Sequence, residues 1–148
     1  MARAIATLFG VGYVRTAPGT VASAVALLLA WLIAWSGGRF AVLAFGIVAF
    51  AIGAWASEVY ATQSKSNDPC ECVIDELAGQ WIACAFAPIA PLAYALAFLL
   101  FRVFDIWKPW PIRHVERLHG GIGIMADDIV AALMTGAILA VLAHLNLI

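Results

Sequence analysis

Long runs of apolar residues, broken by a few glycines, prolines and charged residues, make up most of the chain. Three of these runs approach the length of about 20 residues that a helix needs to cross the apolar core of a bilayer, and they cover residues 21–36, 40–57 and 129–148. Only Gly37, Gly38 and Arg39 separate the first two runs, which predicts a tight turn between neighbouring helices. We therefore expect these three runs to form membrane-spanning helices.

A fourth apolar run, residues 77–101, is interrupted by two prolines, Pro88 and Pro91, which disfavour one straight helix. Seven of the eight Lys and Arg residues lie in three stretches outside the runs: Arg3, Arg15, Lys65, Arg102, Lys108, Arg113 and Arg117. Such residues favour the cytoplasmic side of a membrane. All three stretches share that side only if residues 77–101 enter and leave the membrane from it, as a proline-broken helical hairpin. Four simple spans would put the most basic loop outside.

The composition agrees with a membrane protein and excludes several other classes. Of the 148 residues, 65% are hydrophobic and 11% are charged, against about 25% charged in an average soluble domain, and the mean hydropathy is +0.99. The net charge of −1 disfavours a basic protein that binds nucleic acid, and three cysteines without a paired C-x-x-C spacing disfavour a disulfide scaffold or a zinc site. We expect one all-α domain over residues 1–148, a polytopic membrane helical bundle in contact with the lipid bilayer; a homo-oligomer is not implied.

Carboxylates cluster at the ends of the expected membrane segments. They precede the hairpin, follow it and open the last helix: Asp68, Glu71, Asp75, Glu76, Asp105, Asp127 and Asp128. One acidic pair at a helix start is ordinary capping, favoured by the helix dipole. Two pairs that converge would repel, by about 4 kcal/mol for unit charges about 4 Å apart at an effective dielectric of 20. Either some carboxyl groups are then protonated or a divalent cation binds among them, and oxygen ligands favour Mg²⁺ over Zn²⁺.

Further polar groups suit an anion beside these carboxylates. Residues 17–20, Ala-Pro-Gly-Thr, with Ser23 one turn later, open the first spanning helix. The free N–H groups and hydroxyls of such a helix start fit an anion site, although Thr20 acting only as an N-cap fits equally well. Residues 120–123, Gly-Gly-Ile-Gly, predict a loop in which backbone approaches a ligand closely, and His119 beside it is a candidate for proton transfer.

The segment that follows the hairpin carries charges at a helical spacing. Arg102, Asp105 and Lys108 recur every third residue and so share a helix face. Cations next to a metal site suit a phosphate ligand. A surface ion pair within a belt of interfacial aromatic residues is the simpler interpretation of the same segment.

Together these residues form an ordered series of motifs that covers residues 9–132: Phe9-Gly10-x-Gly12-Tyr13, Ala17-Pro18-Gly19-Thr20-x-x-Ser23, Asp68-Pro69, Val73-Ile74-Asp75-Glu76-x-x-Gly79, Phe101-Arg102-x-Phe104-Asp105-Ile106-x-Lys108-Pro109-x-Pro111 and Gly120-Gly121-x-Gly123-Ile124-Met125-x-Asp127-Asp128. In this series the chain resembles bacterial phosphatidylglycerophosphatase A, an Mg²⁺-dependent lipid phosphatase of the inner membrane. The resemblance implies hydrolysis of phosphatidylglycerophosphate to phosphatidylglycerol and inorganic phosphate, with the active site facing the cytoplasm.

The chemistry that this resemblance implies assigns roles to the clustered residues. The expected Mg²⁺ ligands are the two acidic pairs: Asp75, Glu76, Asp127 and Asp128. With Asp105 as a further ligand or base, the expected catalytic residues are Asp75, Asp105, Asp127 and Asp128. The expected substrate-binding residues are Gly19, Thr20, Ser23, Arg102, Lys108 and His119. A metal-bound water is the expected nucleophile, and a phospho-aspartate is the rival, disfavoured because the chain has no D-x-D-x-[TV] signature.

A small membrane transporter that couples to cations through its carboxylates is the competing function. Acids beside membrane helices and a proline-broken hairpin occur in such pathways as well. A transporter needs carboxylates near the middle of its spans, whereas the interiors of the expected spans carry no charge. The sequence therefore favours the phosphatase.

Overall fold

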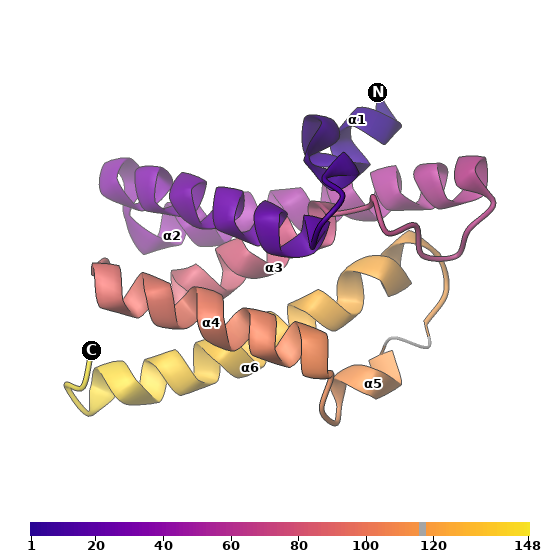
Figure 1. Ribbon diagram of the computed structural model, residues 1–148. Helices are drawn as coiled ribbons and strands as arrows, with labels where there is room; N and C mark the ends of the chain where they lie inside the picture. Colours follow the sequence, from indigo (N-terminus) through magenta and orange to yellow (C-terminus); the bar gives the residue numbers. More distant parts are fainter. Residues whose placement is uncertain (116–117) are drawn as a thin grey trace.

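The computed structural model describes residues 1–115 and 118–148, and in these residues the chain is built from helices joined by loops (Figure 1). In chain order the elements are α1 (Ala2–Ala6), the 3-10 helix η1 (Leu8–Tyr13), α2 (Pro18–Ser64), α3 (Ile74–Ala85), α4 (Pro91–Trp107), α5 (Ile112–Val115) and α6 (Gly120–His144). The all-α fold expected from the sequence is confirmed. Arg117, one of the basic residues counted above, lies outside the described residues.

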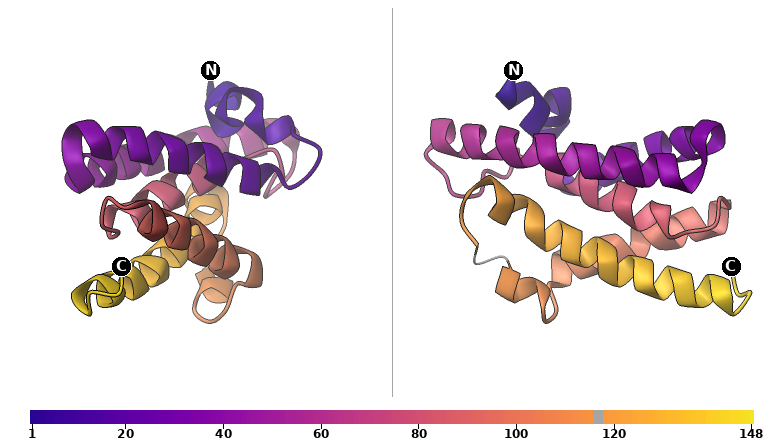
Figure 2. Two further views of the ribbon diagram at one scale, coloured as in Figure 1. Left: turned by 60° about the vertical axis from the view of Figure 1, so that its left-hand side comes forward. Right: turned by 180° about the vertical axis from the view of Figure 1, so that it is seen from behind.

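The long helix α2 consists of two antiparallel arms. Gly38 interrupts it with φ 72° and ψ −179°, a backbone conformation open almost only to glycine, and the chain reverses there (Figures 1 and 2). The turn expected at residues 37–39 is thus confirmed. Each arm buries small residues at spacings of three or four: Ala22, Ala26, Ala30 and Ala34 on the first, and Gly46, Ala49, Gly53 and Ala56 on the second. Small residues let neighbouring helices approach closely.

Large apolar side chains lie on the outside of the same helix. Leu28, Leu32, Trp35 and Phe45 are all more than half exposed. Both α2 and α6 are long and apolar enough to cross a membrane. A bundle with small residues inside and large apolar residues outside suits surroundings of lipid better than water, in line with the expected membrane protein.

Helices α3 and α4 form the expected hairpin. The chain turns back at residues 86–90, and the first turn of α3 meets the last turns of α4, where Arg102 Nη1 lies 3.7 Å from Glu76 Oε1. The turn satisfies much of its own backbone, since the N–H groups of Phe86, Ala87 and Ala90 donate to carbonyls within it or in the last turn of α3. Internal hydrogen bonding of this kind is what backbone at membrane depth requires.

The N-terminal elements α1 and η1 support the loop that leads into α3. The N–H of Val73 donates to the carbonyl of Ala6 at 2.9 Å. Gly12 lies so close to the loop that a Cβ atom there would stand 2.0 Å from the carbonyl oxygen of Glu71. These contacts fix where α3 begins, and with it the position of the acidic residues in its first turn.

The start of the last helix corrects the expectation from the sequence. Residues 120–123 were expected to form a loop and Asp127 and Asp128 to open the helix. Instead α6 begins at Gly120, so both carboxylates lie about two turns inside it, at 3.6 residues per turn.

Close packing against a neighbouring helix accounts for a glycine in this segment. A Cβ atom on Gly121 would stand 1.8 Å from the carbonyl oxygen of Ala54 in α2, so α6 and α2 touch backbone to backbone here. The Glu58 carboxylate accepts a hydrogen bond from the Gly121 N–H and so caps the start of α6.

The two ends of the bundle differ in charge. The turn at Gly38, the tip of the α3–α4 hairpin and the C-terminus share one end (Figure 1). Among the described Lys and Arg residues, only Arg39 belongs to that end. The others lie before α2, just after it, or from the end of α4 into α5. The acidic residues of the site lie at this second, charged end.

Replacing Gly121 by Ala should destabilise the protein, because the added methyl group must displace the Ala54 carbonyl. Overpacking of this kind costs about 1–3 kcal/mol and should lower the Tm of the purified protein in detergent. Ile122→Ala is the matched control, since Ile122 is an exposed neighbour in the same turn. An unchanged Tm for Gly121→Ala would contradict the close contact between α6 and α2.

Candidate active site and metal centre

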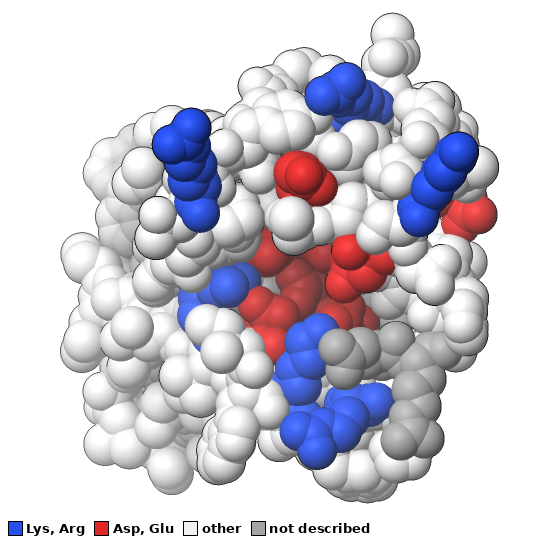
Figure 3. Space-filling view, turned by 45° about the vertical axis from the view of Figure 1, so that its right-hand side comes forward, with Lys and Arg blue, Asp and Glu red and all other residues white. Residues whose placement is uncertain are grey.

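A hollow of about 630 Å³ lies at the charged end of the bundle. It is lined by the start of α2, the loop before α3, the first turn of α3, the end of α4 and the first turns of α6. Acidic side chains gather inside it, with basic side chains next to them (Figure 3). Segments that are far apart in the sequence thus contribute charged groups to one cavity.

Helix α3 contributes Asp75 and Glu76 from its first turn, where the helix dipole favours negative charge. Asp75 Oδ1 accepts a hydrogen bond from the N–H of Glu76 at 3.1 Å. Burial, and next the neighbouring Glu76, raise the pKa of Asp75 well above its ordinary value. Burial also raises the pKa of Glu76, against the opposing effect of Arg102. The ionised forms of both groups are therefore costly unless a cation accompanies them.

Helix α6 contributes Asp127 and Asp128, which are only 9% and 2% exposed. Asp127 Oδ1 accepts the N–H of Asp128 at 3.1 Å, and Asp127 Oδ2 pairs with Lys108 Nζ at 2.8 Å. Asp128 Oδ2 is buried and has no hydrogen-bond partner among the described residues. A buried polar atom without a partner costs stability, so this oxygen is available to a ligand.

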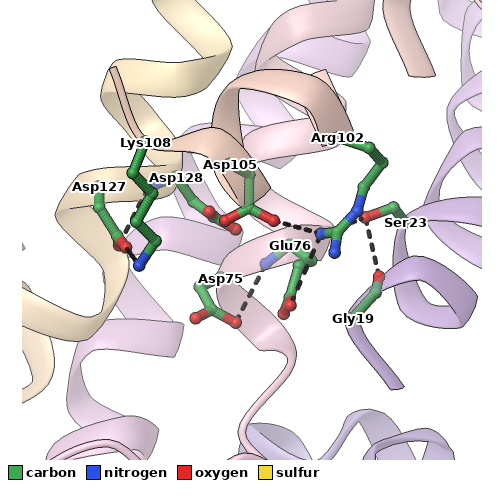
Figure 4. Close-up of polar contacts among 9 residues, drawn as sticks. All are labelled: Gly19, Ser23, Asp75, Glu76, Arg102, Asp105, Lys108, Asp127 and Asp128. Carbon is green, nitrogen blue, oxygen red and sulfur yellow. Dashed lines mark hydrogen bonds and ion pairs between the residues drawn. The ribbon is translucent and has the colours of Figure 1, made fainter. Parts of the chain in front are cut away.

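The last turns of α4 place an acid between two cations (Figure 4). Arg102 Nη1 lies 2.5 Å from Asp105 Oδ2 and 3.7 Å from Glu76 Oε1. Lys108 ends the helix in the left-handed conformation, with φ 47°, and its side chain reaches Asp127 on α6. The shared face expected for Arg102, Asp105 and Lys108 is thus turned to the other carboxylates.

The start of α2 forms another part of the wall of the hollow. Thr20 is not the N-cap, because α2 begins at Pro18 and Ala17 occupies the cap position without a side-chain hydrogen bond. A Cβ atom on Gly19 would stand 2.0 Å from Glu76 Oε1, so the start of α2 lies directly against this carboxylate. Ser23 Oγ donates to the Gly19 carbonyl at 2.9 Å and accepts from Arg102 Nη1 at 3.4 Å. Ser23 therefore contacts the site indirectly, through its hydrogen bond with Arg102.

The structure brings most of the expected site residues into this cavity. The lining includes Gly19, Asp75, Glu76, Arg102, Asp105, Lys108, His119, Asp127 and Asp128. Thr20 and Ser23 are not among the lining residues. Asp68 also lines the cavity; the sequence placed it among the clustered carboxylates but gave it no metal-binding or substrate-binding role.

The acidic residues form two groups that suit a metal ion. Asp75, Glu76 and Asp128 make one group and Asp105, Asp127 and Asp128 the other, and in each group one oxygen per residue lies within 4.8 Å of the others. Glu76 Oε2 is, like Asp128 Oδ2, buried without a hydrogen-bond partner among the described residues. Carboxylate oxygens are the donors that hard divalent cations prefer. The residues present therefore fit a divalent metal ion.

Comparisons with known proteins agree on one family. A family model described as Phosphatidylglycerophosphatase A matches residues 4–143. The chain is 34% identical over 142 residues to phosphatidylglycerophosphatase A of Escherichia coli, covering 95% of this chain and 82% of that protein. It is 36% identical over 131 residues to phosphatidylglycerophosphatase A of Haemophilus influenzae, covering 87% and 80%.

A third relative carries a different name. A Bacteroides thetaiotaomicron protein named "Putative phosphatidylinositol-3-phosphatase" is 33% identical over 144 residues, covering 93% of this chain and 90% of that protein. No solved structure gives a significant match. The names of all three relatives describe phosphatases that act on a lipid.

Proposed function

Because the chain belongs to the phosphatidylglycerophosphatase A family, we propose that it hydrolyses phosphatidylglycerophosphate to phosphatidylglycerol and inorganic phosphate with the help of Mg²⁺. The observation that carries this proposal is the convergence of five carboxylates and two basic side chains, drawn from α3, α4 and α6, in one cavity. Such a site can neutralise a phosphate group and hold a cation next to it.

Mg²⁺ is the cation that the donor set favours. Both groups of candidate ligands consist of carboxylates, and their expected members from the sequence are Asp75, Glu76, Asp127 and Asp128. When bound, the ion would supply charge stabilisation at the phosphoryl oxygens and a water of lowered pKa. Asp105, held by Arg102 at the centre of the cluster, is the further ligand or the base.

The remaining residues bind the phosphate and manage protons. Arg102 and Lys108 contribute positive charge next to the carboxylates, and the first-turn N–H groups of Gly19 and Thr20 have no acceptors within their helix. Water attacks phosphorus, the bond from phosphorus to the glycerol oxygen breaks, and that oxygen takes up a proton. His119, an exposed residue at the cavity and the N-cap of α6, is the candidate to supply it.

The arrangement of charge suits a lipid substrate at a membrane surface. The apolar arms of α2 and the body of α6 would lie in the bilayer, while the cavity stands at the end that carries most of the basic residues. Lys and Arg favour the cytoplasmic side, so the cavity would face the cytoplasm at the inner membrane. The acyl chains then stay in lipid while the phosphate enters the site.

The transporter alternative is less well supported. It needs carboxylates distributed along a path through the spans. Asp127 and Asp128 do lie within α6, but they face the same cavity as Asp75, Glu76 and Asp105, so the acids form one cluster near one end. The Bacteroides relative's name gives a closer alternative, another lipid phosphomonoester, and assays with phosphatidylglycerophosphate and phosphatidylinositol 3-phosphate side by side distinguish the two substrates.

Asp127→Asn should reduce phosphate release from phosphatidylglycerophosphate by more than about 100-fold, because it replaces an anionic metal ligand by a neutral amide of nearly equal size. Phosphate release by purified protein in mixed micelles measures the effect, and the Tm shows that the variant is folded. Glu71→Gln, outside the cavity lining, is the control and should keep full activity. Normal turnover by Asp127→Asn would refute the metal role of Asp127.

Lys108→Ala should chiefly raise KM, by about 10- to 100-fold, which corresponds to the 1.5–3 kcal/mol typical of a charged hydrogen bond. A smaller fall in kcat is expected as well, because Lys108 also pairs with Asp127. Arg113→Ala, which removes an exposed basic side chain from nearby α5, is the matched control. A KM equal to that of the unchanged protein would argue against phosphate binding by Lys108.

A further inference from the structure

We propose that the cavity holds two divalent cations, with Asp128 as the ligand that they share. This inference rests on the proposed function and specifies the number of ions and the residue between them. It follows from the geometry of the carboxylates, from their unsatisfied oxygen atoms and from the charge that a phosphate substrate must meet.

The two groups of candidate ligands overlap in one residue. One group joins Asp75 and Glu76 of α3 to Asp128, and the other joins Asp105 of α4 and Asp127 of α6 to the same Asp128. Figure 4 shows the Asp128 carboxylate next to that of Asp105, with Asp75 and Glu76 of α3 below them in the view. A carboxylate has two oxygen atoms and several lone pairs, so one side chain can serve both groups.

The packing of α3 against α6 explains why Asp128 occupies this place. Gly79 stands one turn after Glu76, and a Cβ atom on it would lie 3.1 Å from the carbonyl oxygen of Asp128 and 2.7 Å from the ring of Phe101. The glycine thus lets α6 approach α3 at the level of Asp128. That approach brings the α6 carboxylates next to those of α3.

The individual carboxylate oxygen atoms differ in whether they have a hydrogen-bond partner. Asp105 Oδ2 and Asp127 Oδ2 each pair with a basic side chain, Arg102 and Lys108 respectively. Asp128 is 2% exposed and its Oδ2 atom has no hydrogen-bond partner among the described residues, and the same holds for the buried Glu76 Oε2. Leaving a buried carboxylate oxygen without a partner is costly. A cation in the group of Asp75, Glu76 and Asp128 would satisfy both atoms, and the carboxylate of Asp128 has a second oxygen that can bind a cation in the other group.

The net charge of the cavity also favours two ions over one. The five clustered carboxylates and Asp68, which also lines the cavity, against Arg102 and Lys108 leave a formal charge of four negative units. One divalent cation leaves the cavity negative, which opposes the entry of a phosphate monoester of charge about −1.5 to −2. Two divalent cations leave it formally neutral, which removes that opposition. Binuclear sites that clamp the attacking and leaving oxygens are a known solution for displacement at phosphorus.

The experiment counts bound ions without an activity assay. Mn²⁺ replaces Mg²⁺ as a paramagnetic probe, and the purified full chain in detergent is titrated by calorimetry and followed by electron paramagnetic resonance. We expect two Mn²⁺ per chain and a spectrum broadened by coupling between neighbouring ions. Asp75→Asn and Asp105→Asn should each weaken one of the two binding steps by at least about tenfold, and Asp128→Asn should weaken both. Glu71→Gln should change neither.

Each other outcome overturns a defined part of this account. One Mn²⁺ per chain at saturation would refute the second ion and leave the proposed metal-dependent phosphatase intact. Two ions with an uncoupled six-line spectrum, or loss of a single ion in Asp128→Asn, would refute the shared ligand. No bound Mn²⁺ in the folded, unchanged protein would overturn the two-ion centre and the metal dependence of the proposed function together.

Discussion

The concentration of negative charge in one partly buried cavity is the constraint on which the rest of this structure depends. Asp75, Glu76, Asp105, Asp127 and Asp128 stand close enough to repel one another strongly, and several are withdrawn from water. Arg102 and Lys108 offset part of this repulsion. A protein that keeps such a cluster must obtain the remaining stabilisation from a bound cation or from protons on the carboxyl groups. The proposed metal-dependent hydrolysis makes use of this requirement.

The fold brings these carboxylates together because its helices pack closely against one another. Glycines stand where the backbone of one helix lies against the backbone of another: Gly79 at Asp128 and Gly121 at Ala54. Both arms of α2 likewise bury small side chains, while their large apolar side chains face outward. In lipid, such a bundle is held by close van der Waals packing between its helices, without the core of large apolar residues that a soluble protein needs. The charged end and the apolar body are thus two parts of one adaptation to a membrane surface.

The sequence predicted those features whose signals are local or directional. The two prolines and the placement of Lys and Arg predicted the α3–α4 hairpin, and Gly37 and Gly38 predicted the turn in α2, because helix breaking and membrane orientation depend on residue type alone. The grouping of carboxylates at the ends of the apolar runs also predicted that they lie close together in the fold. The predicted start of α6 was wrong. Glycines at residues 120–123 are compatible both with a loop and with a helix that packs closely against a neighbour, and the local sequence is the same in both cases. The loop and the helix are distinguished by the positions of Ala54 and Glu58 on α2. The hydrogen bond between Ser23 and Arg102 could not be predicted either, because it too depends on how two distant helices pack.

The central claim is that these carboxylates act on a lipid phosphate by holding a divalent cation. The most direct measurement is phosphate release from phosphatidylglycerophosphate in lipid vesicles by the purified protein, first after treatment with EDTA and then after Mg²⁺ is restored. The account predicts that release stops in EDTA and returns to its original rate with Mg²⁺. Release that continues at an undiminished rate in excess EDTA would contradict it.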